Sequence, residues 1–216
     1  ALPARSEMCI RDRFSIQDGY RDNLSKAVTL DVKGAKKLLD EAGWKEGKDG
    51  VRVKDGKKLE LRYPVFSDDP NIKNIAVSIQ SDLKNVGISL KIEDHPSSDF
   101  APIMSKKQFD LVMSSFVSTD PYGVAYFRQT YASDSTLNKS GTGSKEFDAK
   151  IAEMEKIADP KKQIAKANEL EAEAFKFYGV MPVYNGATKR AVKEKVANYG
   201  AMGFVKLPIQ NIGFVK

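Results

Sequence analysis

The feature that most constrains the fold is a change of hydrophobic period between residues 59 and 92. Apolar and polar residues alternate over Leu59–Tyr63, which is the period of a half-buried strand. Over Ile72–Val86 the apolar residues recur at helical spacing, and over Ile88–Ile92 the alternation returns. Because a strand, a helix and a second strand follow at short intervals, the sequence predicts a βαβ unit.

Turn-forming residues set the expected ends of these elements. Pro64 and the segment Ser67–Pro70 are expected to end the first strand, and Gly87 is expected to end the helix. A short helix with Phe100, Ile103 and Met104 facing inward is expected over 99–107. A further strand is expected over Phe109–Val117.

The segment before the βαβ unit predicts a helix followed by a hairpin. Asp31 can cap a helix that Gly43 ends. Its apolar stripe consists of Ala35, Leu38, Leu39 and Ala42. Trp44 is expected to pack over the end of this helix, and the glycine-rich stretch 45–58 predicts a surface hairpin.

Two helices are predicted in the C-terminal half. The first covers Glu146–Ile157, and the second begins at Asp159–Pro160, a capping residue followed by proline at the first helical position. A short strand is expected to begin at Gly179. The whole pattern predicts an α/β fold of one large or two small domains in 216 residues.

The amino-acid composition limits the classes of function that this protein can have. The 35 Lys and Arg and 29 Asp and Glu give a net charge of +6, but they are spread along the chain. This favours a solvated, lysine-rich surface over a nucleic-acid groove. No apolar run approaches the roughly 18 residues that cross a bilayer, and the single cysteine, Cys9, excludes an intrachain disulfide.

Motifs for catalysis, metal binding and nucleotide binding are missing from the sequence. His95 is the only histidine, and it is predicted to be a surface residue of a loop. The pair Asp68–Asp69 lies in a turn, where capping explains it better than acid–base chemistry. The sequence therefore predicts no enzyme activity, no cofactor and no metal site.

The best candidate for a binding site is the tract Ser114–Tyr126, which follows the predicted strand at 109–117. Backbone groups at the end of a buried strand are fixed and can pair with an extended ligand. Other roles stay open for these residues. Asp120 before Pro121 is also a common turn former. The small serines and Phe116 could pack in the core, as could Tyr122, Tyr126 and Phe127.

The tract from Phe109 to Asp148 carries a family resemblance. A strand beginning Phe-Asp-Leu leads into the loop Asp120–Pro121, and a spaced motif then opens a helix. That motif consists of Asn138, Ser140, Gly141, Glu146, Phe147, Asp148 and Ile151. The tract resembles the second lobe of the extracellular solute-binding proteins of peptide-type ABC importers, family 5. The sequence of this tract is similar to that of a Gram-positive, actinobacterial subgroup of the family.

The resemblance implies a type II periplasmic-binding-protein-like lobe, with a βαβ mixed sheet flanked by helices, as a fragment of a two-lobe protein. Residues 14–184 would form the second lobe. Residues 185–216 would return to the first lobe, and without it they would expose apolar side chains. These are Phe204, Leu207, Ile209 and Ile212. Residues 1–13 resemble translated sequencing-adapter read-through and are expected to be a non-native leader without a secretory signal.

The resemblance also implies a function: capture of a peptide or similar solute between two lobes and its delivery to ABC permease subunits. The expected protein is monomeric and extracytoplasmic, either a cell-surface lipoprotein or periplasmic, and binds no nucleic acid. The cleft residues of this lobe would be Ser115, Phe116, Val117, Ser118, Asp120 and Tyr122.

One departure from the family pattern bears on the ligand. The loop from Phe116 to Pro121 is short, and Val117 and Ser118 stand where a carboxylate for a ligand's ammonium group is expected. The ligand could be a peptide, a glycoside or a lipid-linked sugar. Alternative functions are an extracellular carbohydrate-active or hydrolytic enzyme, a basic nucleic-acid module, and a scaffold or sensor of the same fold.

Overall fold

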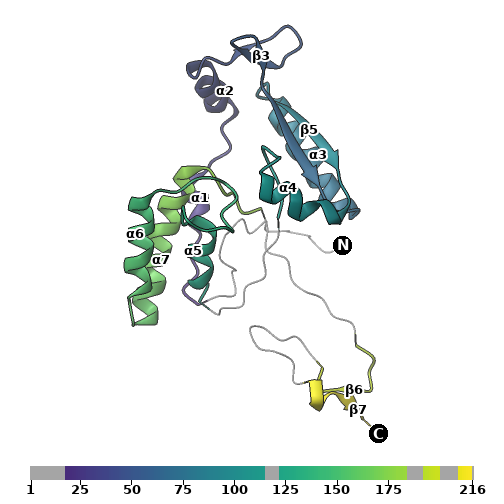
Figure 1. Cartoon of the computed structure of the whole chain (residues 1–216), viewed down its shortest axis with the longest axis vertical. Helices are drawn as coiled ribbons and strands as arrows, with labels where there is room; N and C mark the ends of the chain where they lie inside the picture. Colours follow the sequence, from purple (N-terminus) through teal and green to yellow (C-terminus); the bar gives the residue numbers. More distant parts are fainter. Residues whose placement is uncertain (1–17, 115–121, 184–191, 200–208, 216) are drawn as a thin grey trace, which may run out of the picture. The chain divides into compact units, whose positions relative to one another are not determined.

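The structure, a computed structural model, divides the chain into two compact units (Figure 1). Unit 2 is Leu30–Phe116, and unit 1 combines Ala1–Thr29 with Val117–Lys216. The structure describes residues 18–114, 122–183, 192–199 and 209–215.

Unit 2 contains the predicted βαβ arrangement. Strand β4 (Glu60–Val65) pairs in parallel with β5 (Ser89–Asp94), and α3 (Pro70–Lys84) connects them and packs on both. Asp69 caps α3 by accepting a hydrogen bond from the Asn71 amide at 2.8 Å. The buried core of this unit consists of Tyr63, Val65, Ala76 and Leu90. The change of period in the sequence is thus confirmed as a strand, a helix and a strand.

Two predictions about the strands of unit 2 were wrong. Pro64 lies inside β4, opposite Glu93 of β5, rather than after the strand. Residues 109–114 of the predicted strand Phe109–Val117 are not a strand, and residues 115–117 lie outside the described part of the chain. The Asp110 carboxylate accepts the Arg62 amide at 2.8 Å, and the Arg62 carbonyl accepts the amides of both Asp110 and Leu111. A side chain therefore takes the place of a backbone acceptor, and the ladder does not form.

A capped helix and a small antiparallel sheet precede the βαβ arrangement. Helix α2 (Val32–Glu41) begins at Asp31, which accepts the Gly34 amide at 2.8 Å. The predicted hairpin is a three-stranded sheet, in which β1 and β3 both pair with β2. The three strands are β1 (Lys45–Glu46), β2 (Arg52–Lys54) and β3 (Lys57–Lys58). Parallel and antiparallel strands thus both occur, in separate sheets.

Arg52 connects these elements of unit 2. Its buried guanidinium donates to the Val86 carbonyl at 2.8 Å, to the Trp44 carbonyl at 2.7 Å and to Asp40 Oδ1 at 2.7 Å. Gly87, with a φ of +87°, has no side chain where a Cβ would lie 2.8 Å from Arg52 Cγ. One arginine therefore joins α2, the small sheet and the end of α3.

The short helix after β5 has a more exposed aromatic residue than its pattern predicts. It consists of η1 (Ser97–Asp99) and α4 (Phe100–Lys106), and Ile103 and Met104 are buried as expected. Phe100 is 40% exposed and meets Phe66 edge-on at 5.2 Å. The inward orientation predicted for Phe100 was wrong, because this ring lies at the start of the helix, against another partly exposed ring.

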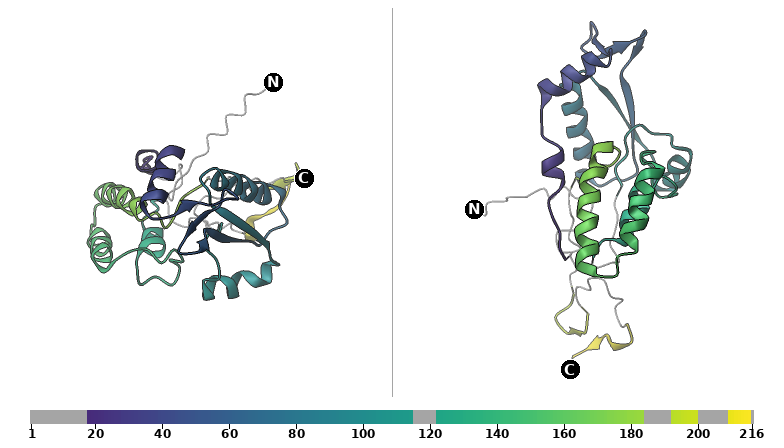
Figure 2. Two further views of the ribbon diagram at one scale, coloured as in Figure 1. Left: turned by 90° about the horizontal axis from the view of Figure 1, so that it is seen from above. Right: turned by 90° about the vertical axis from the view of Figure 1, so that its left-hand side faces the viewer.

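Unit 1 is built from helices. Helices α6 and α7 lie side by side, and α5 packs against both (Figures 1 and 2). The elements are α1 (Leu24–Ala27), α5 (Ala125–Tyr131), α6 (Lys145–Glu155), α7 (Pro160–Ala174) and η2 (Phe175–Phe177). The core includes Val124, Phe127, Tyr131, Phe147, Ile151, Met154, Leu170 and Ala174. Both helices predicted between Glu146 and Phe177 are confirmed.

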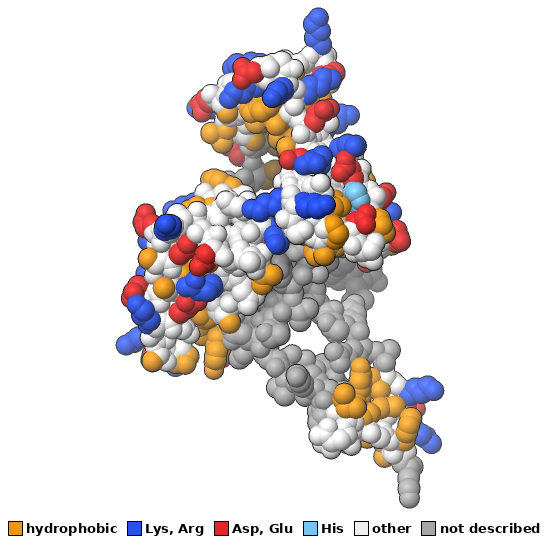
Figure 3. Space-filling view, viewed as in Figure 1, with side chains coloured by type: hydrophobic (Ala, Val, Ile, Leu, Met, Phe, Trp, Pro, Cys, Tyr) orange, Lys and Arg blue, Asp and Glu red, His pale blue; other side chains and the backbone are white. Residues whose placement is uncertain are grey.

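The C-terminal part contains a two-stranded hairpin. Strand β6 (Val196–Ala197) pairs antiparallel with β7 (Gly213–Phe214), and η3 (Ile209–Asn211) precedes β7. Apolar side chains gather on its surface (Figure 3), and Ile209 is exposed as predicted. Ile212 is only partly exposed, and Phe204 and Leu207 lie outside the described residues. The strand expected from Gly179 is absent over residues 179–183. In the described ranges, none of the helices has the length and apolar character of a membrane span.

Candidate ligand-binding site

The predicted site residues fall largely in a gap between described segments. Ser115, Phe116, Val117, Ser118 and Asp120 lie outside the described residues. Tyr122 is described and is 39% exposed. The structure therefore gives direct geometry for one of the six predicted contacts and for the segments that flank the others.

A buried anchor lies two residues after Tyr122. Val124 is buried and leads into α5, where the Phe127 ring lies 4.9 Å from the Tyr131 ring and 6.3 Å from the Phe147 ring. Of the aromatic residues left open between pocket and core, Phe127 is core. The exposed Tyr122 ring thus stands at the start of a helix held by aromatic packing.

An open hollow of about 820 Å³ lies beside Tyr122, wholly within unit 1. Its walls come from the segment before α1, from Tyr122, and from the first half of α7. The lining residues are Asp18, Gly19, Tyr20, Arg21, Tyr122, Asp159, Pro160, Lys161, Ile164, Ala165 and Asn168. Protein pockets that bind small ligands commonly have this size.

Buried amides hold two of these walls together. The Asn168 side chain donates to the Gly19 carbonyl at 2.9 Å and to the Ile164 carbonyl at 3.0 Å. Asn23 donates to Asn168 Oδ1 at 3.2 Å and also to the Glu171 carboxylate. The segment before α1 is therefore fixed against α7 by side chains that are themselves buried.

Sequence reasoning missed this hollow. One signal was present, because Asn168 and Glu171 occupy apolar-face positions of α7, among Ile164, Leu170 and Ala174. Polar residues on a buried helix face need hydrogen-bond partners from another segment. That signal predicts a contacting segment, but it does not say which one.

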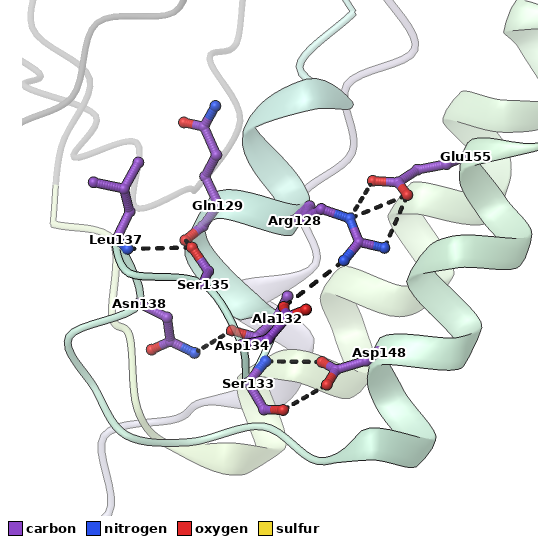
Figure 4. A network of polar contacts seen from close by, with 10 residues as sticks. All are labelled: Arg128, Gln129, Ala132, Ser133, Asp134, Ser135, Leu137, Asn138, Asp148 and Glu155. Atoms are coloured by element: carbon purple, nitrogen blue, oxygen red, sulfur yellow. Dashed lines mark hydrogen bonds and ion pairs between the residues drawn. The ribbon is translucent and has the colours of Figure 1, made fainter.

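The family motif around Asn138 forms a loop held by its own side chains (Figure 4). The Asn138 amide donates to the Ala132 carbonyl at 3.1 Å and to the Thr142 carbonyl at 2.9 Å. Its Oδ1 accepts from the Ser140 amide at 3.1 Å and from the Ser140 hydroxyl at 2.6 Å. Gly141 has a φ of +72°, which favours glycine. These residues shape the turn before α6 rather than a binding surface.

Two further contacts fix α6 to the end of α5 (Figure 4). Asp148 accepts hydrogen bonds from the Ser133 amide, at 2.8 Å, and from the Ser133 hydroxyl. Arg128 donates to both oxygens of Glu155, at 2.8 to 3.1 Å, and this bond raises the pKa of the guanidinium. The helix that begins beside Tyr122 is therefore held at its far end as well.

The charged residues singled out in unit 2 have structural roles. Asp69 caps α3, as predicted, and Asp68 forms an ion pair with Lys73 at 3.6 Å. His95 is partly exposed, with Nδ1 3.4 Å from Asp99 and Nε2 3.9 Å from Glu93. Within the described ranges, no three His, Cys, Asp or Glu side chains gather where they could hold a metal ion.

Known structures with this arrangement define the class of protein. The oligopeptide-binding protein from Thermus thermophilus, solved with a pentapeptide, matches with a TM-score of 0.80 and 19% identity, covering 96% of this chain and 39% of that one. A periplasmic oligopeptide-binding protein from Thermotoga maritima, solved with mannohexaose, matches with a TM-score of 0.65 and 25% identity, covering 82% and 35%. The fold is that of the type II periplasmic binding proteins.

Sequence comparison identifies the family. The model of the bacterial extracellular solute-binding proteins, family 5 (middle part), matches residues 15–138. The oligopeptide-binding protein OppA of Mycobacterium tuberculosis is 32% identical over 205 residues, 93% of this chain and 33% of that protein. The chain belongs to the family 5 extracellular solute-binding proteins, and it spans about a third of the length of the curated relatives it matches.

Proposed function

We propose that this chain is part of the substrate-binding component of an ABC importer, which captures a peptide or similar solute and delivers it to the membrane permease. The observation that carries this proposal is the family match over residues 15–138, which includes the predicted ligand segment. The M. tuberculosis relative is named an oligopeptide-binding protein. One structural relative holds a pentapeptide and another holds mannohexaose, so we leave both solute classes open.

The proposed mechanism is closure of two lobes around the solute. Such a protein responds to a ligand only through the ligand's preference for the closed state over the open one. In our proposal residues 14–184 form the second lobe and residues 185–216 return to the first. The exposed apolar side chains of the β6–β7 hairpin, including Ile209, Phe214 and Val215, support this, because a covering partner would bury them.

We propose that this lobe contacts the solute through the segment 115–122. The contacting residues would be Ser115, Phe116, Val117, Ser118, Asp120 and Tyr122. The support is the exposed ring of Tyr122 next to the buried anchor at Val124. A loop that leads into a rigid helix can present backbone groups at fixed positions, and extended ligands pair with such groups.

The proposed partners are the transmembrane subunits of an ABC permease, and the proposed solution state is a monomer without nucleic acid. Members of this family are extracellular solute-binding proteins. We propose that the protein acts outside the cytoplasmic membrane, as a lipoprotein or in the periplasm, and that it has no enzyme activity. Basic and acidic side chains are interspersed on the described part of the face shown in Figure 3, which fits a solvated surface better than a nucleic-acid groove.

The test is solute binding by the complete protein in which this chain occurs. Pools of peptides and of oligosaccharides are offered to the wild type, and bound species are identified by native mass spectrometry. Calorimetry then compares Asp120→Asn and Tyr122→Ala with a control, Tyr178→Ala, whose ring is 81% exposed and does not line the hollow.

We expect Tyr122→Ala to weaken binding about tenfold or more, as loss of an aromatic contact commonly does. The control should bind like the wild type. Unchanged affinity in both site variants would remove these residues from the site. Failure of every pool to bind would contradict the proposed function itself.

A further inference from the structure

Helix α2 exposes an apolar stripe. The apolar residues of this helix recur at spacings of three or four positions and therefore share one of its sides. They are Val32, Ala35, Leu38, Leu39 and Ala42, and none of them is buried. Leu38 is 67% exposed, and Leu30, just before the helix, is 94% exposed. Exposed apolar side chains gathered on one surface mark a site of interaction with a protein or a membrane.

The other side of α2 is basic. A shallow depression there is lined by Lys33, Lys36, Lys37, Asp40, Glu41 and Lys45. Asp40 forms an ion pair with Arg52 at 2.7 Å, and Glu41 lies 3.8 Å from Lys37. Because the lining has four lysines and two carboxylates, and each carboxylate already has a cationic partner, the net charge of this side is positive.

The small sheet after α2 extends the positive charge. The segment 31–58, which contains both the helix and the sheet, has nine Lys and Arg and six Asp and Glu. Apolar and basic side chains lie next to one another over this part of unit 2 in Figure 3. A partner that fits both features is apolar inside and anionic at its surface, which describes a bilayer of acidic phospholipids.

We propose that α2 is an interfacial helix that lies on an anionic bilayer, with the stripe around Leu38 at the acyl-chain boundary and the lysines at the phosphate groups. Helices that bind in this way have sharply separated sides, low overall hydrophobicity and lysines on the polar side. The proposal goes beyond solute capture and does not depend on it.

The lysines also favour a bilayer over the rest of the complete protein as the cover of the stripe. Lys33 and Lys36 lie within one helical turn of Val32 and Leu39. Against a protein surface their ammonium groups would need carboxylate partners or would lose hydration at a cost. At a bilayer their long side chains reach the phosphates while the stripe is covered.

The experiment measures binding of the complete protein, prepared without lipid modification, to sedimented vesicles. Vesicles of phosphatidylglycerol and phosphatidylcholine in equal parts are compared with vesicles of phosphatidylcholine alone. The charge variant is Lys33→Gln/Lys36→Gln. Its control, Lys106→Gln/Lys107→Gln, removes the same charge from exposed positions at the end of α4.

The apolar stripe has its own pair of variants. Leu38→Gln is compared with Val77→Gln, which changes a residue of α3 that is 55% exposed. We expect the wild type to bind the anionic vesicles more tightly than the neutral ones, and less tightly as salt is raised. The charge variant should weaken binding about tenfold or more, and Leu38→Gln about fivefold or more. Both controls should bind like the wild type. Absence of binding to anionic vesicles, or equal weakening by the controls, would overturn the proposal.

A second measurement tests whether the stripe is accessible in the complete protein. Leu38→Cys and Val77→Cys are labelled with a water-soluble maleimide, with and without anionic vesicles. We expect both to react rapidly in buffer, and vesicles to slow only Leu38→Cys. Slow labelling of Leu38→Cys in buffer would show that another part of the protein covers the stripe, and would overturn the proposal. Solute affinity, measured on the same preparations, tests the proposed function separately.

Discussion

Helices α2 and α6 resemble each other in sequence and differ in what surrounds them. Both begin at a side-chain cap, Asp31 on the Gly34 amide at 2.8 Å and Ser144 on the Phe147 amide at 3.2 Å. The apolar residues of α2 are the more sharply segregated to one side, yet none of its residues is buried, whereas α6 buries three. Segregation thus predicts which side of a helix can pack, while burial requires a partner from elsewhere in the chain.

The sharpest test of this difference is truncation of one apolar side chain in each helix. Phe147 in α6 is 1% exposed and meets the Phe177 ring edge-on at 5.0 Å, so Phe147→Ala should lower the free energy of unfolding by about 3–5 kcal/mol. Leu38 in α2 is 67% exposed, and Leu38→Ala should change it by less than about 0.5 kcal/mol. Urea unfolding followed by circular dichroism measures both. Similar losses would mean that α2 is packed as tightly as α6.

A polar contact holds α2 where apolar burial does not. Arg52→Ala removes the buried hydrogen bond to the Val86 carbonyl and the partly buried bonds to the Trp44 carbonyl and to Asp40, and it leaves the two carbonyls without this donor. We expect it to lower the free energy of unfolding by about 2–4 kcal/mol. Lys54→Ala, two residues further along β2, removes only an exposed bond to the Ala42 carbonyl and is the control. Amide exchange of α2 should accelerate in the first variant, and unchanged exchange there would show that Arg52 does not hold the helix.

The third comparison concerns the hydrogen-bonded loop that precedes α6, since no comparable loop precedes α2 among the described residues. Asn138→Ala removes the bonds to the Ala132 and Thr142 carbonyls and should lower the free energy of unfolding by about 1–3 kcal/mol. Thr136→Ala changes an exposed residue of the same loop and should have no measurable effect. Thermal unfolding of the two variants measures the contrast. Equal melting temperatures would show that the loop holds its shape without the Asn138 side chain.

The N-terminal caps of α2 and α6 should contribute equally to the free energy of unfolding. Asp31→Ala and Ser144→Ala each leave one amide of the first helical turn without its acceptor, and each should lower the free energy of unfolding by about 1 kcal/mol. Because capping is local, the effect should not follow the difference in burial. The measurement is urea unfolding of both variants. A much larger loss for Ser144→Ala would show that capping and packing are coupled in α6.

The smallest expected effect is a dependence on pH at the end of α2. The hydrogen bond from Arg52 lowers the pKa of Asp40 below its usual 3.8. A lowered pKa in the folded state means that this contribution to stability is present above the unfolded pKa and is lost as pH falls through the folded value. Unfolding midpoints in urea between about pH 5 and about pH 2 should therefore depend less on pH in Asp40→Asn than in the wild type. Identical pH profiles would contradict the role given to this pair.

Much of the local structure was predictable from the sequence. The caps at Asp31, Asp69 and Asp159, and the glycine that follows α2, all act between neighbouring residues. One prediction failed where a distant group replaced the expected neighbour. The strand expected from Phe109 is interrupted because Asp110 accepts the Arg62 amide, 48 positions away in the chain. Of the candidate site, sequence reasoning predicted Tyr122 and missed Arg21 and Lys161.

The sequence by itself determined the order and type of most helices and strands, the βαβ unit and the family, because periodicity, caps and spaced motifs depend on residues close together in the chain. Only the tertiary structure decided that the Asn138 motif shapes a loop, that Arg52 joins three elements, and that Arg21 and Lys161 line the same hollow. These outcomes depend on contacts that the folded chain, and not its local pattern, supplies. For Asn138 and Arg52 the physical reason is that desolvated polar groups must find partners wherever the folded chain provides them. Arg21 and Lys161 line one hollow because the buried Asn168 holds the segment before α1 against α7.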